Sequence, residues 1–284
     1  MRQFIVDAVP DKNGLIVVTG KDFHYLANVL RSRAGDMIDV RLLDQRLVQM
    51  TVAKVDQVKK EIQLQLAGND SDFSGGQNVR VVTDTVEGKV NFDFEIYLFQ
   101  FVAMPAKMEL IIRQATECGV QKIIPVAGQY SQSGGIKSAR EAADKFGKGG
   151  RWDKIVVEAR QQSGSEINTT VEKVLTVEQA CNYWKEICNG IQNRDCVAIV
   201  LYERNAGSKM LMQTLTQFDS IKKVAVFVGC EGGISPEEIE ILKNAGVKIV
   251  HLATNILRCE TASLYGVASL QSALLEKNLW QDRE

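Results

Sequence analysis

The chain has 284 residues, 45% of them hydrophobic and 24% charged, which is enough to bury one large core or two smaller ones. Its formal net charge of −1 disfavours a protein that coats nucleic acid nonspecifically, because neutralising phosphates needs clustered Lys and Arg. No apolar run approaches the ~20 residues that span a bilayer, and Asp7 interrupts the start too early for a signal peptide, so we expect a soluble, cytoplasmic protein without a membrane partner.

The first 67 residues predict a small β-barrel. Short runs of β-forming residues alternate with turns there, at 4–6, 15–18, 37–43, 47–55 and 61–66. One helix is predicted between them, from Asp22 to about Arg33, because apolar residues recur at helical spacing and Gly35 follows. We take residues 1–70 as one domain.

A polar, glycine-rich stretch at 68–78 predicts a linker and a domain boundary. After it, residues 79–94 predict a hairpin that turns at Glu87 and Gly88. The second domain is therefore expected over residues 79–284, with this hairpin as an addition at its start.

From Glu95 onward, strand and helix patterns alternate, which predicts an α/β domain with a mainly parallel sheet covered by helices on both faces. The expected strands are 95–103, 120–126, 195–202, 222–229 and 247–252. The expected helices are 105–118, 150–162, 177–188, 208–216, 236–245 and 260–279.

Two segments follow expected strands and carry polar groups. Residues 228–235 form a glycine-rich turn between a buried strand and a helix that begins at Pro236, which is where α/β sheets bind ligands. Residues 252–262 follow the next strand and place Arg258 and Glu260 near the start of a long helix. Both segments are expected on the same rim of the sheet.

These features also have plainer interpretations. The glycine turn is neither GxGxxG nor a Walker motif, so it is either ordinary turn chemistry or a ligand cradle. Glu231 either caps backbone amides or meets a cationic or hydroxyl group of a ligand. Arg258 and Glu260 either form a surface ion pair or serve a function, and an arginine at a helix start opposes the helix dipole, which favours function.

The histidines and cysteines do not predict a metal site. His24 and His251 are the only histidines, and His251 falls in an expected strand as a structural residue. The six cysteines include no CxxC pair, so we expect neither disulfides nor zinc. His24, with Arg31 and Arg33 on the following turns, either lines an RNA-facing surface or belongs to a solvated helix face.

The combination of motifs resembles a known family, the bacterial small-subunit ribosomal RNA uridine-N3 methyltransferases of the SPOUT superfamily. The matching segments are 24–31 with Gly35 and Asp36, 107–109, 115–120, 151–155, 158–163, the glycine turn and 256–262. The last two are the specific ones. The resemblance implies a SPOUT α/β domain with a trefoil knot, preceded by a PUA-like β-barrel that positions RNA.

The resemblance also implies S-adenosylmethionine as cofactor, bound through main-chain groups of three loops with apolar walls. The residues it assigns to the cofactor are Leu201, Gly229, Glu231, Gly232, Gly233, Ile234, Leu252, Ile256, Leu257 and Thr261. Because a uridine N3 proton must leave during methylation, Arg258 is expected to stabilise the uridine anion, and Glu231 or Glu260 to accept the proton or orient Arg258.

The implied partners are small-subunit ribosomal RNA or the 30S particle, and a second copy of the chain in a homodimer to which the long C-terminal helix contributes. The residues assigned to RNA are His24, Arg31, Arg33, Arg160 and Gln162.

The chain departs from the family pattern at several positions. Gln114, Tyr130, Ser165 and Asn255 stand where the family usually has cations, which predicts a weaker grip on phosphates. Tyr130 could instead stack on a base. Cys230 and Ala253 replace a usual Pro and Gly, so less backbone preorganisation is expected.

Three functional hypotheses therefore remain. The first is the uridine methyltransferase, or a methyltransferase with a different RNA target. The second is a catalytically silent RNA-binding or ribosome-assembly protein of the same fold. The third, independent of the resemblance, is a nucleotide-binding α/β enzyme, which the lack of Lys or Arg in the glycine turn disfavours.

Overall fold

The computed structural model describes residues 3–67, 92–190, 195–204, 208–218 and 220–281. The chain forms two compact units, one of residues 1–90 with 161–164 and one of residues 91–160 with 165–284. The predicted linker at 68–78 and the predicted hairpin at 79–94, apart from residues 92–94, lie outside the described residues.

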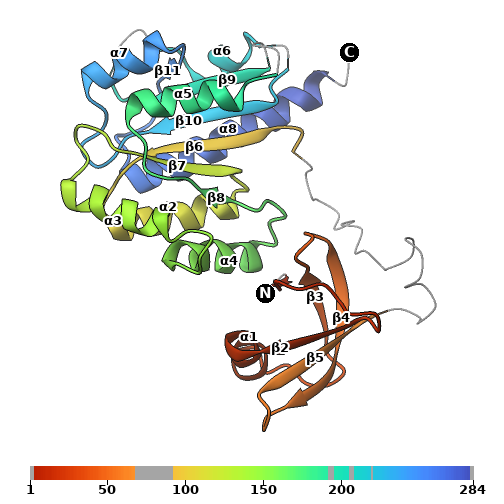
Figure 1. The fold of residues 1–284 in the computed structure, drawn as a ribbon. Helices are drawn as coiled ribbons and strands as arrows, with labels where there is room; N and C mark the ends of the chain where they lie inside the picture. Colours follow the sequence, from red (N-terminus) through yellow and green to blue (C-terminus); the bar gives the residue numbers. More distant parts are fainter. Residues whose placement is uncertain (1–2, 68–91, 191–194, 205–207, 219, 282–284) are drawn as a thin grey trace. The chain divides into compact units, whose positions relative to one another are not determined.

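The first unit is built on a five-stranded sheet that curls around its own apolar core (Figure 1). The strands are β1 (Phe4–Ile5), β2 (Leu15–Thr19), β3 (Met37–Arg41), β4 (Leu47–Asp56) and β5 (Glu61–Leu66), in the order β1-β3-β4-β5-β2. All five predicted strand runs are confirmed. Within the described residues β1 and β2 are the two edges, so the sheet is a half-barrel and not a closed barrel.

The helix predicted from Asp22 to Arg33 has the wrong bounds. The segment forms α1 (Gly20–His24) and continues into a π-helical turn, η1 (Tyr25–Val29). Arg31 then takes a left-handed conformation with φ 57°, and the Ser32 N–H donates to the Leu26 carbonyl at 2.9 Å. A residue in this conformation commonly ends a helix and is usually a glycine. Because the residue here is an arginine, the sequence pattern did not indicate the end of the helix.

The second unit has a six-stranded parallel sheet, as predicted. Its strands are β6 (Glu95–Phe101), β7 (Lys122–Val126), β8 (Thr170–Val171), β9 (Cys196–Leu201), β10 (Lys223–Val228) and β11 (Lys248–Val250), in the order β11-β9-β10-β6-β7-β8. The two-residue strand β8 was not predicted. Because all strands are parallel, the loops after β6, β9, β10 and β11 meet at one edge.

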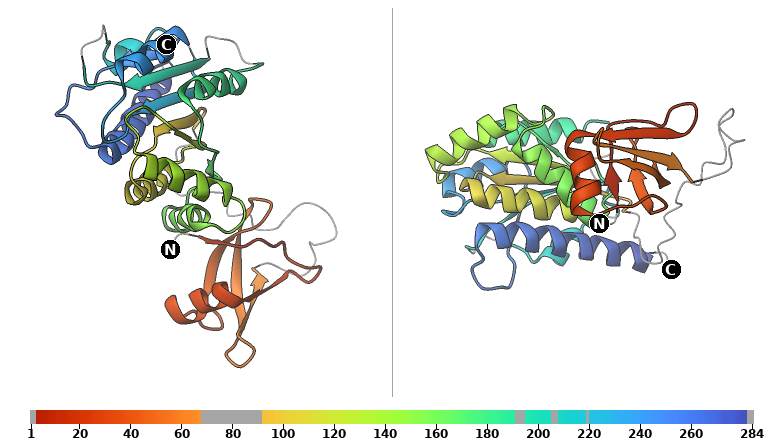
Figure 2. Two further views of the ribbon diagram at one scale, coloured as in Figure 1. Left: turned by 60° about the vertical axis from the view of Figure 1, so that its left-hand side comes forward. Right: turned by 90° about the horizontal axis from the view of Figure 1, so that it is seen from below.

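Helices cover both faces of this sheet (Figures 1 and 2). They are α2 (Pro105–Glu117), α3 (Ser133–Asp144), α4 (Arg151–Ser163), α5 (Val177–Ile187), α6 (Leu211–Leu215), α7 (Pro236–Asn244) and α8 (Cys259–Gln281). Side chains of α2, α3, α4, α6 and α8 share one core, while α5 and α7 pack on the opposite face. In the described part of the chain, no helix has the length and apolar character needed to cross a membrane.

The helix α3 was missed from sequence because it begins with two residues of very low helix propensity, Gly134 and Gly135. The second of these is buried, and a Cβ there would lie 3.2 Å from the carbonyl oxygen of Ala103 at the end of β6. Close packing therefore explains the glycine, and it brings the start of α3 to the edge where the loops meet.

A first expectation concerns the core under the sheet. The Phe99 ring is fully buried and stacks on Phe227 with centroids 4.3 Å apart, so Phe99→Ala should lower the free energy of unfolding of the second unit by about 3–5 kcal/mol. Denaturation followed by tryptophan fluorescence reports this unit, because Trp152, Trp184 and Trp280 all belong to it. The partly exposed Val157→Ala is the control, with a change within about 0.5 kcal/mol. Equal effects of the two variants would contradict the packing described.

Candidate functional site

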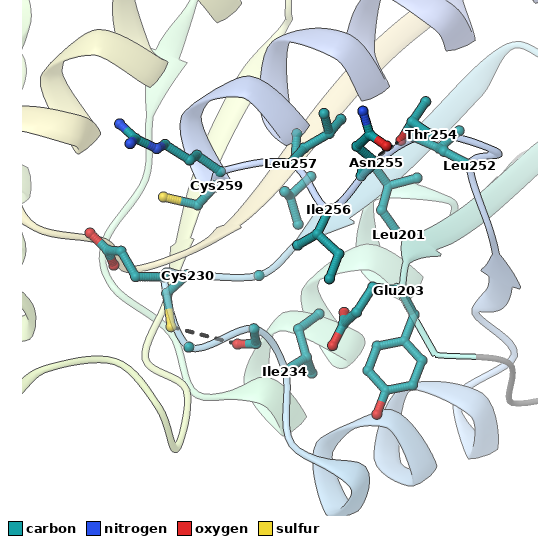
Figure 3. Close-up of a pocket in the computed structure, with 18 of the residues that line it drawn as sticks. Leu201, Glu203, Cys230, Ile234, Leu252, Thr254, Asn255, Ile256, Leu257 and Cys259 are labelled. Atoms are coloured by element: carbon teal, nitrogen blue, oxygen red, sulfur yellow. Dashed lines mark hydrogen bonds between the residues drawn. The ribbon is translucent and has the colours of Figure 1, made fainter.

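A cavity of about 380 Å³ lies at the carboxyl edge of the parallel sheet. Its volume is in the range of small-molecule sites. Three loops line it, at 201–203, 228–234 and 251–259, together with Lys107 of α2. Figure 3 shows Leu201, Ile234 and Ile256, one from each loop, around its interior.

The structure brings most of the predicted cofactor residues together here. Those that line the cavity are Leu201, Gly229, Glu231, Gly232, Gly233, Ile234, Leu252, Ile256 and Leu257. Thr261 does not line it and is exposed on α8. Asn255 is at the cavity, and Tyr130 packs beside the glycine turn.

The glycines of the turn are required by close approach and backbone conformation. A Cβ on Gly229 would lie 2.9 Å from the carbonyl carbon of Gly233, and one on Gly232 would lie 2.8 Å from Cβ of Tyr130. Gly233 has φ 78° and donates its N–H to the Cys230 carbonyl at 2.9 Å. Ordinary turn chemistry is therefore present, and the same turn also forms a wall of the cavity.

The helix that follows the turn has its first amides satisfied by the protein. Ser235 Oγ accepts the Glu238 N–H at 3.2 Å, and the Glu238 carboxylate accepts the N–H groups of Ser235 and Gln129 at 2.9 and 2.7 Å. This capping box fills the position where a phosphate would bind a helix N-terminus. The arrangement disfavours the phosphate-binding hypothesis.

A fully buried glutamine connects the turn to the C-terminal helix. The Gln100 side-chain N–H donates to the carbonyl oxygens of Phe101 at 2.9 Å and Gly229 at 3.2 Å, and its oxygen accepts the Ser263 hydroxyl. Ser263 Oγ also lies 2.8 Å from the Cys259 carbonyl. Gln100 was not predicted, although a polar residue within the apolar strand β6 was a signal for such a role.

A second missed residue is Lys107 in the first turn of α2. Its ammonium lies 3.4 Å from Glu231 Oε1 and 3.6 Å from Glu260 Oε2. Glu231 Oε1 also accepts the Met104 N–H at 3.0 Å. The signal in the sequence was a lysine at the start of a helix, where a cation opposes the dipole.

The surroundings keep both carboxylates ionised. Burial alone would raise the pKa of Glu231, but the Met104 N–H, its own backbone N–H and the Lys107 ammonium lower it below its usual value. The pKa of Glu260 is lowered by its own backbone N–H, by the Cys259 thiol and by Lys107 and Arg258. Burial, with the nearby carboxylates, raises the pKa of Cys259 to about 12, so this thiol stays neutral.

The alternative of a simple Arg258–Glu260 ion pair is not what the structure has. Glu260 pairs with Lys107, while the guanidinium of Arg258 is exposed at the cavity and makes no ion pair within the described residues.

His251 also differs from its predicted place, because β11 ends one residue before it. It lines the cavity, and its buried Nδ1 has no hydrogen-bond partner among the described residues.

The residues assigned to RNA divide into two groups. His24, Arg31, Arg33 and Gln162 are exposed. Arg160 is 3% exposed and donates to the Asn168 side chain at 2.8 Å and to the Glu166 carbonyl at 3.2 Å. The buried guanidinium of Arg160 holds the segment after α4, and its assignment to RNA stays a prediction.

All six cysteines are free thiols. In the ranges that the structure describes, no three His, Cys, Asp or Glu side chains are grouped so that they could hold a metal ion.

Comparison with known proteins identifies relatives of the chain. A family model described as RNA methyltransferase domain matches residues 90–271, well over half of the chain. The ribosomal RNA small subunit methyltransferase E 2 of Borreliella burgdorferi is 26% identical over 279 residues, which cover 98% of this chain and 100% of the relative. The ribosomal RNA small subunit methyltransferase E of Aquifex aeolicus is 32% identical over 182 residues, which cover 64% of this chain and 68% of the relative.

The fold is shared with a solved structure, the ribosomal RNA small subunit methyltransferase E from Neisseria gonorrhoeae bound to S-adenosyl methionine. The TM-score is 0.71 at 19% identity, over 96% of this chain and 97% of that chain. The predicted fold class is thereby confirmed, while the knot stays an implication of the resemblance.

The buried glutamine provides a second expectation. Gln100→Leu leaves the Ser263 hydroxyl and the Gly229 carbonyl without this partner, so the free energy of unfolding should fall by about 1–3 kcal/mol. Amide hydrogen exchange at Gly233 should become faster because the turn loses its tie to α8. Gln217→Leu is the control, since that exposed side chain bonds only within its own helical turn. Unchanged exchange at Gly233 in Gln100→Leu would contradict the role given to this residue.

Proposed function

The chain belongs to the RNA methyltransferase family of the ribosomal RNA small subunit methyltransferases E, and we propose that it methylates N3 of a uridine in small-subunit ribosomal RNA, with S-adenosylmethionine as the methyl donor. The observation that carries the proposal is the cavity, where the glycine turn, an exposed Arg258 and the ionised Glu231 meet.

The cavity fits the cofactor in shape and chemistry. Gly229 and Gly232 leave backbone where a Cβ would clash, so main-chain amides and carbonyls can approach a ligand closely. Ile234, Leu252 and Ile256 supply apolar contact for an adenine ring. The cofactor, when bound, supplies an electrophilic methyl group on a sulfonium.

The protein's own groups handle the proton and the charge. When N3 of uridine forms its bond to the methyl carbon, the carbon–sulfur bond breaks and the N3 proton must leave. Glu231 lines the cavity, and its Oε2 accepts no hydrogen bond from another described residue, so we assign the proton to this oxygen. The Arg258 guanidinium stabilises the negative charge on the uracil ring. Glu260 does not line the cavity and acts through Lys107.

The proposal also includes two partners, a ribosomal RNA or 30S substrate and a second copy of the chain. The exposed His24, Arg31, Arg33 and Gln162 are assigned to contacts with ribosomal RNA or the 30S particle. A homodimer in which α8 contributes to the interface is also proposed. A cytoplasmic location is also part of the proposal, because the proposed substrate is ribosomal RNA.

A third expectation tests the cofactor. Calorimetric titration with S-adenosylmethionine should give micromolar binding. Gly232→Val should weaken it at least about tenfold, because the new side chain meets Tyr130 and displaces the turn. Gly134→Val is the control, since a Cβ there has no atom within 4 Å. Folded wild-type protein that binds no cofactor would favour a catalytically silent RNA-binding protein.

A fourth expectation tests the reaction. Purified protein should transfer labelled methyl groups to undermethylated small subunits, and mass spectrometry of the nucleosides should identify N3-methyluridine. Arg258→Ala should reduce the rate by about 10²–10³-fold, because its charge acts on the uracil anion. The exposed Arg113→Ala on α2 is the control. A methyl group on another nucleotide would refute the N3 assignment, and no transfer to any RNA would refute the activity.

A further inference from the structure

We propose that Lys107 is a positioning residue for methyl transfer: held between Glu231 and Glu260, it fixes one oxygen of Glu231 and leaves the other available to receive the proton. This inference rests on the proposed function for its chemistry, and its geometry stands on the contacts of three separate segments.

Glu231 is held at one oxygen only. Its Oε1 accepts the backbone N–H of Met104 at 3.0 Å and lies 3.4 Å from the Lys107 ammonium. Within the described residues Oε2 accepts no hydrogen bond from another residue, while the backbone N–H of Glu231 itself also favours the ionised carboxylate. Two donors on one oxygen fix the plane of the carboxylate, and the second oxygen keeps its full capacity to accept.

Glu260 holds the lysine in place from the other side. Its Oε2 lies 3.6 Å from the Lys107 ammonium, and the same oxygen lies 3.2 Å from the Cys259 sulfur. The side chains of Lys107, Glu231 and Glu260 are 34%, 29% and 17% exposed. The three charges are therefore partly shielded from water, so salt and solvent screen their interactions less than those of a fully exposed ion pair.

The position of the lysine has a cost that a purely structural residue would avoid. Lys107 is in the first turn of α2, close to the positive end of the helix dipole. Glu231, which reaches the Met104 N–H at this helix start, provides the negative charge favoured there. The lysine thus gains its stabilisation from the two carboxylates and not from its own helix.

The charged and titratable groups around the two carboxylates come from the three segments that meet here. They are Lys107 of α2, Cys230 of the glycine turn, and Arg258 and Cys259 at the start of α8. Of these, Lys107 is the cation that lies within ion-pair distance of both carboxylates in the described structure.

The sign of the expected pH effect follows from this arrangement. A carboxylate must be ionised to accept a proton, and Lys107 favours the ionised form of Glu231. Removing the lysine should raise the pKa of Glu231, so activity should be lost at a higher pH as the solution is acidified. Glu260→Gln should lower the pKa of Glu231, because it removes an anion that competes for Lys107, and Lys107 then pairs with Glu231 alone.

The first measurement does not depend on methyl transfer. Carboxyl carbons of glutamate can be labelled and titrated by NMR in the full chain, with Glu231→Gln identifying the signal. Lys107→Met should move the titration midpoint of Glu231 upward, Lys107→Arg should leave it near wild type, and Glu260→Gln should move it downward. Lys243→Met is the matched control, because Lys243 forms an exposed ion pair of 3.4 Å with Glu240, away from the cavity.

The second measurement is the pH–rate profile of methyl transfer in the same variants. In Lys107→Met the acidic limb of the pH–rate profile should move to higher pH together with the titration midpoint of Glu231. The plateau rate should fall by about ten- to a hundredfold, which is the effect of displacing a reacting group by about 1 Å. Lys107→Arg should recover most of the rate.

The two measurements separate the possible failures. An unchanged Glu231 midpoint in folded Lys107→Met, or a plateau and acidic limb like those of wild type, overturns the positioning role. If Lys107→Met does not fold, a Glu231 midpoint that fails to fall in Glu260→Gln overturns it as well. Shifted midpoints in a protein that transfers no methyl group would support the geometry and refute the proposed function.

Discussion

The close approach of three loop segments at one edge of the sheet is the constraint on which the site depends. The backbone of the 229–233 turn folds so tightly on itself and against Tyr130 that side chains are excluded at Gly229 and Gly232. A turn of this kind has polar groups facing inward, and a buried carbonyl without a partner is costly. The Gln100 side chain, on β6, donates a hydrogen bond to the Gly229 carbonyl. Through the Ser263 hydroxyl it also connects the turn to α8. The loops that line the cavity are therefore fixed by the core.

Charge is arranged on this frame in two separate groups. Lys107, Glu231 and Glu260 form a row in which one cation serves two anions, so its charge is already compensated. Arg258 lies at the same cavity without an ion pair in the described residues. Among the described residues that line the cavity, Arg258 is the cation without an ion pair that a developing negative charge on a ligand would meet. The proposed division of roles, with Arg258 stabilising an anion and Glu231 accepting a proton, rests on this difference in pairing.

Much of the fold was predictable because burial has a period in the sequence. The apolar runs of β6, β9 and β10 and the helical spacing of α2 identified their elements, and polar residues after the strands identified two of the loops. The helix α3 could not be found in this way, because Gly135, which disfavours a helix, is there for close packing against Ala103. Lys107 and Gln100 were missed for a related reason: their partners are more than 100 residues away, at Glu231 and Gly229, and periodicity carries no information on such contacts.

Cys230 and Asn255 both depart from the residues that the family resemblance implies, and they differ in whether a local interaction compensates for the change. Cys230 stands where a proline usually restricts the backbone, yet the turn is closed by the Gly233 N–H on the Cys230 carbonyl and by the Cys230 thiol on the Gly233 carbonyl, at 2.9 and 3.5 Å. Local hydrogen bonds thus supply the order that proline would give. Asn255 has no such substitute, because it lies exposed at the cavity and brings no charge. If the resemblance gives the right family residue at this position, Arg258 is left as the exposed arginine of this loop, and the proposed site should be sensitive to its substitution.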